Sequence, residues 1–297
     1  MKPILVSGAT GVVGATGRHL AELLLKHGAP VRAMVRKQDE RSQKLAEAGA
    51  EIVTADFLDE DAVRSAMQGI DVAYFCPPVF EVLLHATTVF AHCAREASVK
   101  RVINLSQWGT VDPILSPATR LHRLGEMIFD WSGVPTSHLL PAMFMEQLSL
   151  VFGPGVRTQG ALMAPFNDKK VSMIAAYDVS RVAAAIALEP ERFATGPYML
   201  TGGANFTLEQ VAGVLSEVLG KPIKYVDIDP AGWKKSWLSR GAPPHLANHL
   251  EKLYEKGRLG RLNYGPTSVV EEVTGAPPTS LKEFFGKYFK DEGARFA

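Results

Sequence analysis

The sequence predicts an α/β protein in which helices cover both faces of a parallel sheet, and three observations support this fold class. An apolar run at residues 3–7 leads directly into a glycine-rich segment. Strand-like and helix-like segments then alternate through the first half of the chain. With 297 residues and 46% hydrophobic content, the chain is long enough for a large core and a second, smaller domain.

The glycine-rich segment after the first strand is typical of a phosphate-binding turn. Gly8 permits a tight turn, Gly11 lets backbone N–H groups approach a pyrophosphate, and Gly14 lets the next helix pack closely on the strand. The phosphates then lie at a helix N-terminus, where free N–H groups favour anions. The expected dinucleotide contacts in this segment are Gly8, Ala9, Thr10, Gly11, Val12, Val13 and Gly14.

The remaining strands of the first half are separated by amphipathic helices. Apolar residues recur at helical spacing in these helices, as at Ala62, Val63, Ala66 and Met67. The alternation predicts a doubly wound, Rossmann-type parallel sheet with its ligand crevice at the carboxyl ends of the strands. We expect strands at 3–7, 31–36, 51–57, 71–76, 101–106 and 136–141.

Beyond residue 150 the pattern changes to shorter elements. We expect Gly153-Pro154-Gly155 to break the chain, and Thr207 to cap a helix over 207–219 with Gln210 three residues on. A helix at 177–188 and strands at 197–200 and 223–228 are also expected. The predicted division is a dinucleotide-binding domain at 1–152, to which 176–200 returns, and a smaller α/β substrate or lid domain at 153–297.

Composition excludes several classes of partner. The 32 basic and 31 acidic residues leave a net charge of +1, without a basic block for nucleic acid or a membrane surface. No signal peptide or membrane-spanning run is evident, which favours a cytoplasmic location. Cys76 and Cys93 are expected as buried free thiols on a strand and a helix. His245 and His249 lack a third ligand, so no metal site is expected.

Motifs spread over nearly the whole chain resemble those of the NmrA-like family of atypical short-chain dehydrogenases. The resemblance implies either an enzyme or a sensor, because that family includes NADPH-dependent quinone oxidoreductases and cofactor-sensing regulators. The matching motifs are the Gly8–Gly14 loop, Val35-Arg36, Ala55-Asp56-Phe57, residues 99–102, residues 132–136, Tyr177-Asp178-Val179 and residues 198–202.

The end of the second strand favours NADP(H) over NAD(H). An NAD-selective site usually carries Asp or Glu there, whereas this chain has Arg36 and Lys37, which can hold a 2′-phosphate with support from Arg41. The alternative is that Arg36 is a solvated strand end. By resemblance, Asp56 and Phe57 border the adenine; alternatively, Asp56 only caps the helix that begins near Asp59.

The ends of the later strands supply the remaining contacts. The resemblance places Cys76, Pro77 and Pro78 beside the ribose and nicotinamide. Ser106 is also expected to contact the cofactor. Apolar and amide side chains after the strands are expected to contact a flat substrate; the alternative is that the methionines beside the aromatic residue belong to the core. The expected contacts are Phe80, Gln107, Trp108, Met143 and Phe144.

The sequence lacks the acid–base pair of ordinary alcohol dehydrogenases. No tyrosine lies between Ser106 and Trp131, and His122 stands where atypical relatives carry a lysine, four residues before Glu126. His122 is the candidate catalytic residue, with Glu126 expected to orient its ring and raise its pKa. The alternative is a surface pair of His122 and Glu126.

These features together predict an NADPH-dependent reductase of a quinone or a similar small conjugated carbonyl compound. The alternative is a non-catalytic NADP(H)-binding sensor that acts through a protein partner. We expect a small-molecule substrate, no direct nucleic-acid or membrane partner, and a monomer or homodimer. The sequence identifies neither the substrate nor the oligomeric state.

Overall fold

The computed structural model describes residues 1–11, 14–79, 81–113 and 116–287. They divide into two compact units. Unit 1 comprises 1–111, 118–140 and 177–199, and unit 2 comprises 112–117, 141–176 and 200–297. The boundary in the middle of the chain therefore falls at 140/141, and not at the 152/153 boundary expected from the sequence.

Unit 1 is built on a seven-stranded sheet. Its strands are β1 (Ile4–Ser7), β2 (Val31–Val35), β3 (Glu51–Thr54), β4 (Val72–Phe75), β5 (Arg101–Leu105), β6 (Thr136–Pro141) and β10 (Gly196–Leu200). The order across the sheet is β10-β6-β5-β4-β1-β2-β3, and the pairs from β3 through β6 are parallel. The strand order reverses direction at β1 and β4, which is where Rossmann-type sheets bind dinucleotides.

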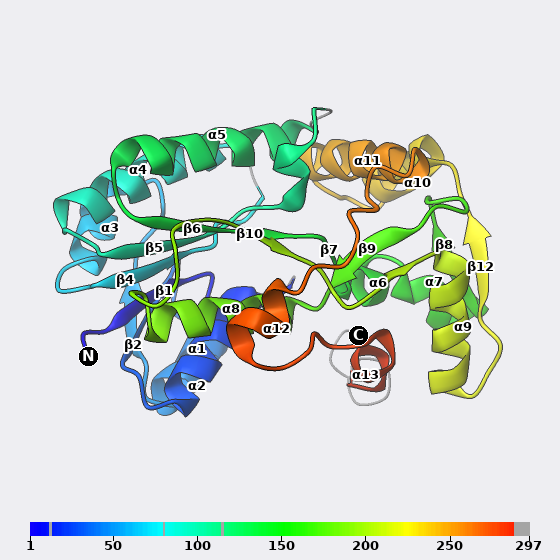
Figure 1. The fold of residues 1–297 in the computed structure, drawn as a ribbon. Coiled ribbons are helices and arrows are strands. Elements are labelled where there is room, and N and C mark those ends of the chain that lie inside the picture. Colours follow the sequence, from blue (N-terminus) through cyan, green and yellow to red (C-terminus); the bar gives the residue numbers. More distant parts are fainter. Residues whose placement is uncertain (12–13, 80, 114–115, 288–297) are drawn as a thin grey trace. The chain divides into compact units, whose positions relative to one another are not determined.

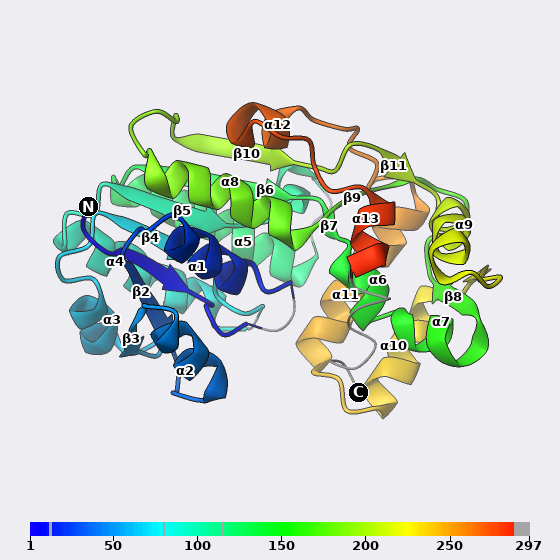
Figure 2. The same cartoon turned by 90° about the horizontal axis from the view of Figure 1, so that it is seen from below.

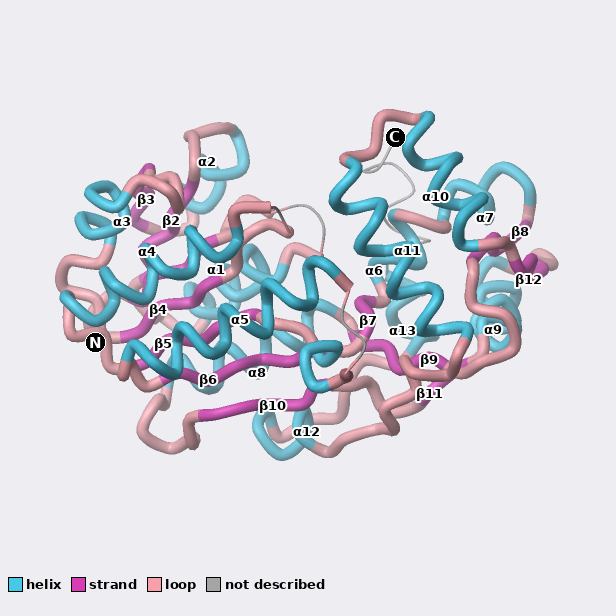
Figure 3. The backbone as a smooth tube through the Cα atoms, turned by 90° about the horizontal axis from the view of Figure 1, so that it is seen from above, coloured by secondary structure: helices cyan, strands magenta, loops and turns pink. Residues whose placement is uncertain are grey.

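Helices cover both faces of this sheet (Figure 1). They are α1 (Thr16–Lys26), α2 (Glu40–Glu47), α3 (Glu60–Ala66), α4 (Leu83–Glu96), α5 (Pro117–Ser132) and α8 (Ala176–Leu188), together with a short 3₁₀ helix, η1 (Trp108–Val111). Helices α3, α4 and α5 lie on one face and α1, α2 and α8 on the other. Figure 2 shows α1 and α8 side by side, and Figure 3 shows the alternation of strands and helices. The expected doubly wound fold is confirmed.

An aromatic cluster fills the space between the sheet and its α4–α5 face. The rings of Phe75 and Phe90 lie 4.6 Å apart, and those of Phe75 and Phe129 lie 5.3 Å apart. All three side chains are fully buried. Burial of such a side chain contributes about 1.5–3 kcal/mol each, so this cluster holds α4 and α5 firmly on β4.

Unit 2 contains short sheets and its own core. The strands are β7 (Met143–Phe144), β8 (Ala161–Ala164), β9 (Val171–Ile174), β11 (Asn205–Phe206) and β12 (Lys224–Asp227). They form a β11-β9-β7 sheet and a β12-β8 pair. The helices are α6 (Glu146–Leu150), α7 (Gly153–Gln159), α9 (Leu208–Leu219), α10 (Pro230–Ser239), α11 (Pro244–Arg258), α12 (Val269–Thr274) and α13 (Leu281–Phe285).

Two local expectations need correction. Gly153-Pro154-Gly155 forms the first turn of α7, because proline in the first turn of a helix loses no hydrogen bond there. Cys76 lies one residue past β4 and is half-buried, whereas Cys93 is buried on α4 as expected; both are free thiols. The predicted capping box of Thr207 and Gln210 is confirmed.

Candidate dinucleotide site

The turn after β1 has the backbone geometry of a phosphate cradle. Gly8 has φ of 68° and Gly14 has φ of 72°, a left-handed conformation that glycine adopts without strain. The Gly11 N–H donates to the Gly8 carbonyl at 2.9 Å, which closes the turn. Ala15 at the N-cap of α1 makes no side-chain capping bond, so the first turn keeps N–H groups for an anion. Val12 and Val13 lie outside the described residues.

Helix α1 approaches strand β1 closely at Gly17. Helix α1 begins only at Thr16, and a Cβ atom on Gly17 would lie 2.5 Å from the Ser7 carbonyl oxygen. A side chain there would therefore push α1 off β1. The sequence carried a signal for this role, since Gly17 continues the three-residue spacing of Gly8, Gly11 and Gly14.

Hydrogen bonds that the sequence analysis missed hold the turn in place. The Ser7 hydroxyl donates to the Tyr74 carbonyl at 2.8 Å and accepts from the Cys76 N–H at 2.9 Å. The Ser180 hydroxyl of α8 donates to the Thr16 carbonyl at 2.9 Å. These bonds link β1 to the end of β4 and α8 to α1, so they hold the two ends of the turn in place.

The end of β2 carries exposed positive charge. Within the described part of the chain, Arg36 and Lys37 have no ion pair or hydrogen-bond partner for their side chains. Arg41 is already engaged: its guanidinium donates to the Thr10 carbonyl at 2.7 Å and pairs with Asp39. That pairing, with backbone bonds from α2, lowers the pKa of the Asp39 carboxyl. A 2′-phosphate would meet the two free cations there, and the Asp39 charge is offset.

The end of β3 supplies an aromatic wall. Phe57 is half-buried, and its ring lies 5.4 Å from Phe75 in an edge-to-face arrangement. Asp56 is exposed and accepts from the Leu58 N–H at 2.9 Å. Asp59, and not Asp56, caps α3 by accepting from Ala62. The alternative reading of Asp56 as the helix cap is therefore wrong.

The end of β4 packs directly against the glycine turn. A Cβ on Gly8 would lie 2.9 Å from the Cys76 carbonyl oxygen. The Cys76 Sγ lies 3.5 Å from the Thr16 hydroxyl, and burial raises the pKa of this thiol. Pro77 is buried and Pro78 is exposed. Phe80, expected to contact substrate, lies outside the described residues.

Polar side chains of α5 form a row against β5 and β6. The Ser106 hydroxyl donates to the Glu126 carboxyl, and burial raises the pKa of Glu126. One turn further along α5, the Asp130 carboxyl lies 3.2 Å from Nε2 of His138. Because the Asn104 amide donates to Nδ1 of His138 at 2.9 Å, Nε2 carries the proton that faces Asp130. No local pattern in the sequence pointed to Asn104, His138 or Asp130.

The environment of His122 differs from the expected one. Its imidazole is half-buried, and loss of solvent lowers its pKa to about 4. In the described residues it makes no hydrogen bond or ion pair with Glu126, whose bonds go to Ser106 and Thr110. The prediction that Glu126 orients His122 and raises its pKa is wrong, because burial outweighs any carboxylate effect. His122 is neutral at pH 7.

The expected substrate contacts belong to both units. In unit 1, Trp108 is buried, and Gln107 is half-buried and accepts from the Thr119 hydroxyl through Oε1 at 3.1 Å. In unit 2, Met143 and Phe144 form β7, are half-buried and pair with Met173 and Ile174 of β9. The NH₂ group of the Gln107 amide is not used in this hydrogen bond.

Other classes of site find no support. In the four segments that the structure describes, no group of His, Cys, Asp and Glu side chains could hold a metal ion. His249 is buried, and its Nδ1 lies 2.7 Å from the Ser116 hydroxyl. No helix in the described residues is long and apolar enough to cross a membrane.

Comparison with known proteins agrees with this geometry. The model of the NmrA-like family matches residues 1–289. The chain is 28% identical to the (4-alkanoyl-5-oxo-2,5-dihydrofuran-3-yl)methyl phosphate reductase of Streptomyces griseus, covering 96% of this chain and 97% of that one. It is 27% identical to the NAD(P)H azoreductase of Xenophilus azovorans, covering 95% of this chain and 96% of that one.

A solved structure extends the comparison to a bound cofactor. The NADPH-dependent quinone oxidoreductase of Escherichia coli, complexed with NADPH, superimposes with a TM-score of 0.84 at 25% identity. The match covers 97% of this chain and 100% of that one. Several homologues and structural neighbours of the chain are thus NAD(P)H-dependent oxidoreductases.

Proposed function

Because the chain belongs to the NmrA-like family, we propose that it is an NADPH-dependent reductase of a quinone or a similar small conjugated compound. The free cations Arg36 and Lys37 beside the glycine turn are the observation that carries the proposal, since they suit a 2′-phosphate. The names of the relatives supply the substrate class: they reduce azo compounds, a conjugated lactone phosphate and quinones.

The residues of this chain would do limited chemistry in such a reaction. Bound NADPH supplies the hydride. Backbone N–H groups of the Gly8–Gly14 turn hold the pyrophosphate, and Arg36 holds the 2′-phosphate. His122 donates a hydrogen bond to the acceptor oxygen as a neutral imidazole, since its pKa of about 4 leaves it uncharged at pH 7.

Glu126 and Ser106 provide a proton within the same unit. Burial raises the pKa of Glu126, so a larger share of this carboxyl keeps its proton near neutrality than an exposed one would. Ser106 contacts Glu126 and follows the carboxyl end of β5; when Glu126 is protonated, the Ser106 hydroxyl would accept that proton while it donates its own to the acceptor. Because a conjugated acceptor becomes an anion when it receives the hydride, a single weak proton donor of this kind is sufficient to neutralise it.

A panel of quinones, enones and azo compounds, with NADPH absorbance as the readout, tests the proposal. We expect turnover of at least one planar conjugated acceptor and a lower KM for NADPH than for NADH. The opposite outcome is tight NADPH binding, measured by calorimetry, with no turnover of any acceptor. That result would favour the alternative, a non-catalytic NADP(H) sensor.

A further inference from the structure

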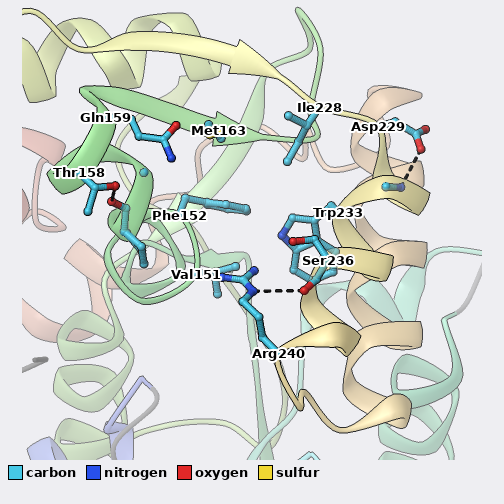
Figure 4. A pocket seen from close by; sticks show the side chains of 13 residues that line it. Val151, Phe152, Thr158, Gln159, Met163, Ile228, Asp229, Trp233, Ser236 and Arg240 are labelled. Atoms are coloured by element: carbon cyan, nitrogen blue, oxygen red, sulfur yellow. Dashed lines mark hydrogen bonds between the residues drawn. The ribbon is translucent and has the colours of Figure 1, made fainter.

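Unit 2 contains a cavity that the proposed reductase chemistry does not use. Its volume is about 540 Å³, within the range of small-molecule pockets. Figure 4 shows Phe152, Met163 and Gln159 on one side of it and Ile228, Trp233 and Arg240 on the other. All of the lining residues belong to unit 2, and none of them is in the glycine turn or at the end of a unit 1 strand.

The apolar walls of the cavity are fixed by the core of unit 2. Phe152 and Trp233 are nearly fully buried, and both pack on Tyr254, with ring centroids 5.9 and 4.7 Å away. Met163 and Ile228 are half-buried and leave apolar surface towards the cavity. A ligand would therefore meet a preformed apolar surface, which reduces the entropy lost on binding.

The cavity lining contains one basic residue, the exposed Arg240, which has no ion pair in the described part of the chain. Arg240 follows the last residue of α10, and its Nε donates to the Ser236 carbonyl at 3.2 Å. Its two terminal nitrogens have no partner in the described part of the chain. Asp229 is the acidic residue of the lining, and its carboxylate is turned to the start of α10, where it accepts from the Gly232 N–H at 2.8 Å (Figure 4).

We propose that this cavity binds a small amphiphilic organic anion, with an aromatic or alkyl body between the apolar walls and an acidic group on the Arg240 guanidinium. Carboxylates, sulfonates and phosphate monoesters match the planar fork of arginine. Neutral apolar compounds of the same size lack this contact and bind more weakly. The site is independent of the dinucleotide, and the proposal stands whether or not the protein is a reductase.

Fluorescence titration with 8-anilinonaphthalene-1-sulfonate on the full-length protein tests the proposal, with NADP⁺ present at saturation to block the dinucleotide site. We expect Arg240→Glu to weaken binding of the probe at least tenfold. Lys235→Glu, which makes the same charge change at an exposed position of α10 outside the lining, should alter the affinity less than twofold. Dodecanoate should displace the probe at a concentration at least tenfold lower than dodecanol.

A second variant blocks the cavity without removing charge. Gly232 lines the cavity, and a Cβ there makes only ordinary contacts, the nearest 3.6 Å from the Asp229 carboxylate. Gly232→Leu should keep the melting temperature of the parent, since leucine favours a helix over glycine, and should weaken probe binding at least tenfold. The proposal is overturned if Arg240→Glu and Gly232→Leu bind the probe as the parent does, or if saturating NADP⁺ leaves no bound probe.

Discussion

The charged side chains at the end of β2 differ in the partners that they already have. Arg41 and Asp39 neutralise each other, and Arg41 also holds the Thr10 carbonyl, so these two residues shape the turn. Arg36 and Lys37 are exposed. Selectivity between the two dinucleotides should therefore depend on Arg36 and Lys37 more than on Arg41.

Arg36→Asp is expected to weaken NADPH binding much more than NADH binding. The variant loses a charge-assisted contact and adds a repulsive charge, which together should cost on the order of 2–4 kcal/mol. Calorimetric titration of both dinucleotides measures the difference. Lys221→Asp, an exposed charge reversal in unit 2, is the matched control and should bind both as the parent does. Equal NADPH affinity of Arg36→Asp and parent would contradict the assignment.

His122→Ala is expected to lower turnover about tenfold to a hundredfold with little change in NADPH affinity, because a hydrogen bond to the acceptor is lost and water replaces it poorly. Since the pKa of His122 is about 4, the ratio of parent to variant rates should stay constant from pH 5 to 8. His85→Ala, an exposed histidine on α4, is the control. Unchanged kinetics would return His122 to a structural role.

At the scale of elements, local sequence signals predicted most strands and helix caps, whereas contacts between distant segments could not be predicted from them. The apolar runs place β1 to β6 within a few residues, and the capping box of Thr207 is visible as a four-residue pattern. The bonds of Ser7 depend on how β4 meets β1, which no local pattern reports, and the glycine spacing that reaches Gly17 does not by itself show where α1 contacts β1. The lowering of the His122 pKa likewise follows from burial, which the helical spacing to Glu126 does not reveal.

The turn between β1 and α1 should lose dinucleotide binding when Gly11 becomes valine. A Cβ on Gly11 already lies 3.0 Å from the Gly8 carbonyl oxygen, and the valine methyl groups would occupy space needed by the pyrophosphate. We expect at least a hundredfold loss of NADPH affinity with a folded circular dichroism spectrum. Gly213→Val, at an exposed helical position with open space, controls for the effect of valine itself. Parental affinity in folded Gly11→Val would exclude this turn as the cradle.

At the scale of the whole chain, the polypeptide passes between the two units several times. The return of 177–199 to unit 1 follows from an amphipathic helix and a strand that the sequence displays. The short excursion of 112–117 into unit 2 is not readable from local pattern. It depends on contacts across the chain, including Asp112 with Arg261 at 3.2 Å and Ser116 with His249 at 2.7 Å.

The stability of the protein should fall as pH rises through the titration of Glu126. Burial raises the pKa of this carboxyl in the folded state; bonds from Ser106 and Thr110 and the nearby His138 lower it, and Asp130 raises it further. A carboxyl whose pKa is raised in the folded state stabilises the protein fully when the pH is below its ordinary pKa, near 4.3. That stability is lost as the pH rises through the raised pKa.

Glu126→Gln keeps an oxygen to accept from Ser106 and does not titrate. Its melting temperature relative to the parent should therefore increase as pH rises from 4 and level off above the raised pKa of the parent carboxyl, as measured by calorimetry at constant ionic strength. Glu47→Gln, an exposed glutamate on α2, should show no such trend. A difference between Glu126→Gln and parent that is independent of pH would mean that the carboxyl ionises in the folded state as easily as in water, and its role as the proton source beside Ser106 would lose its basis.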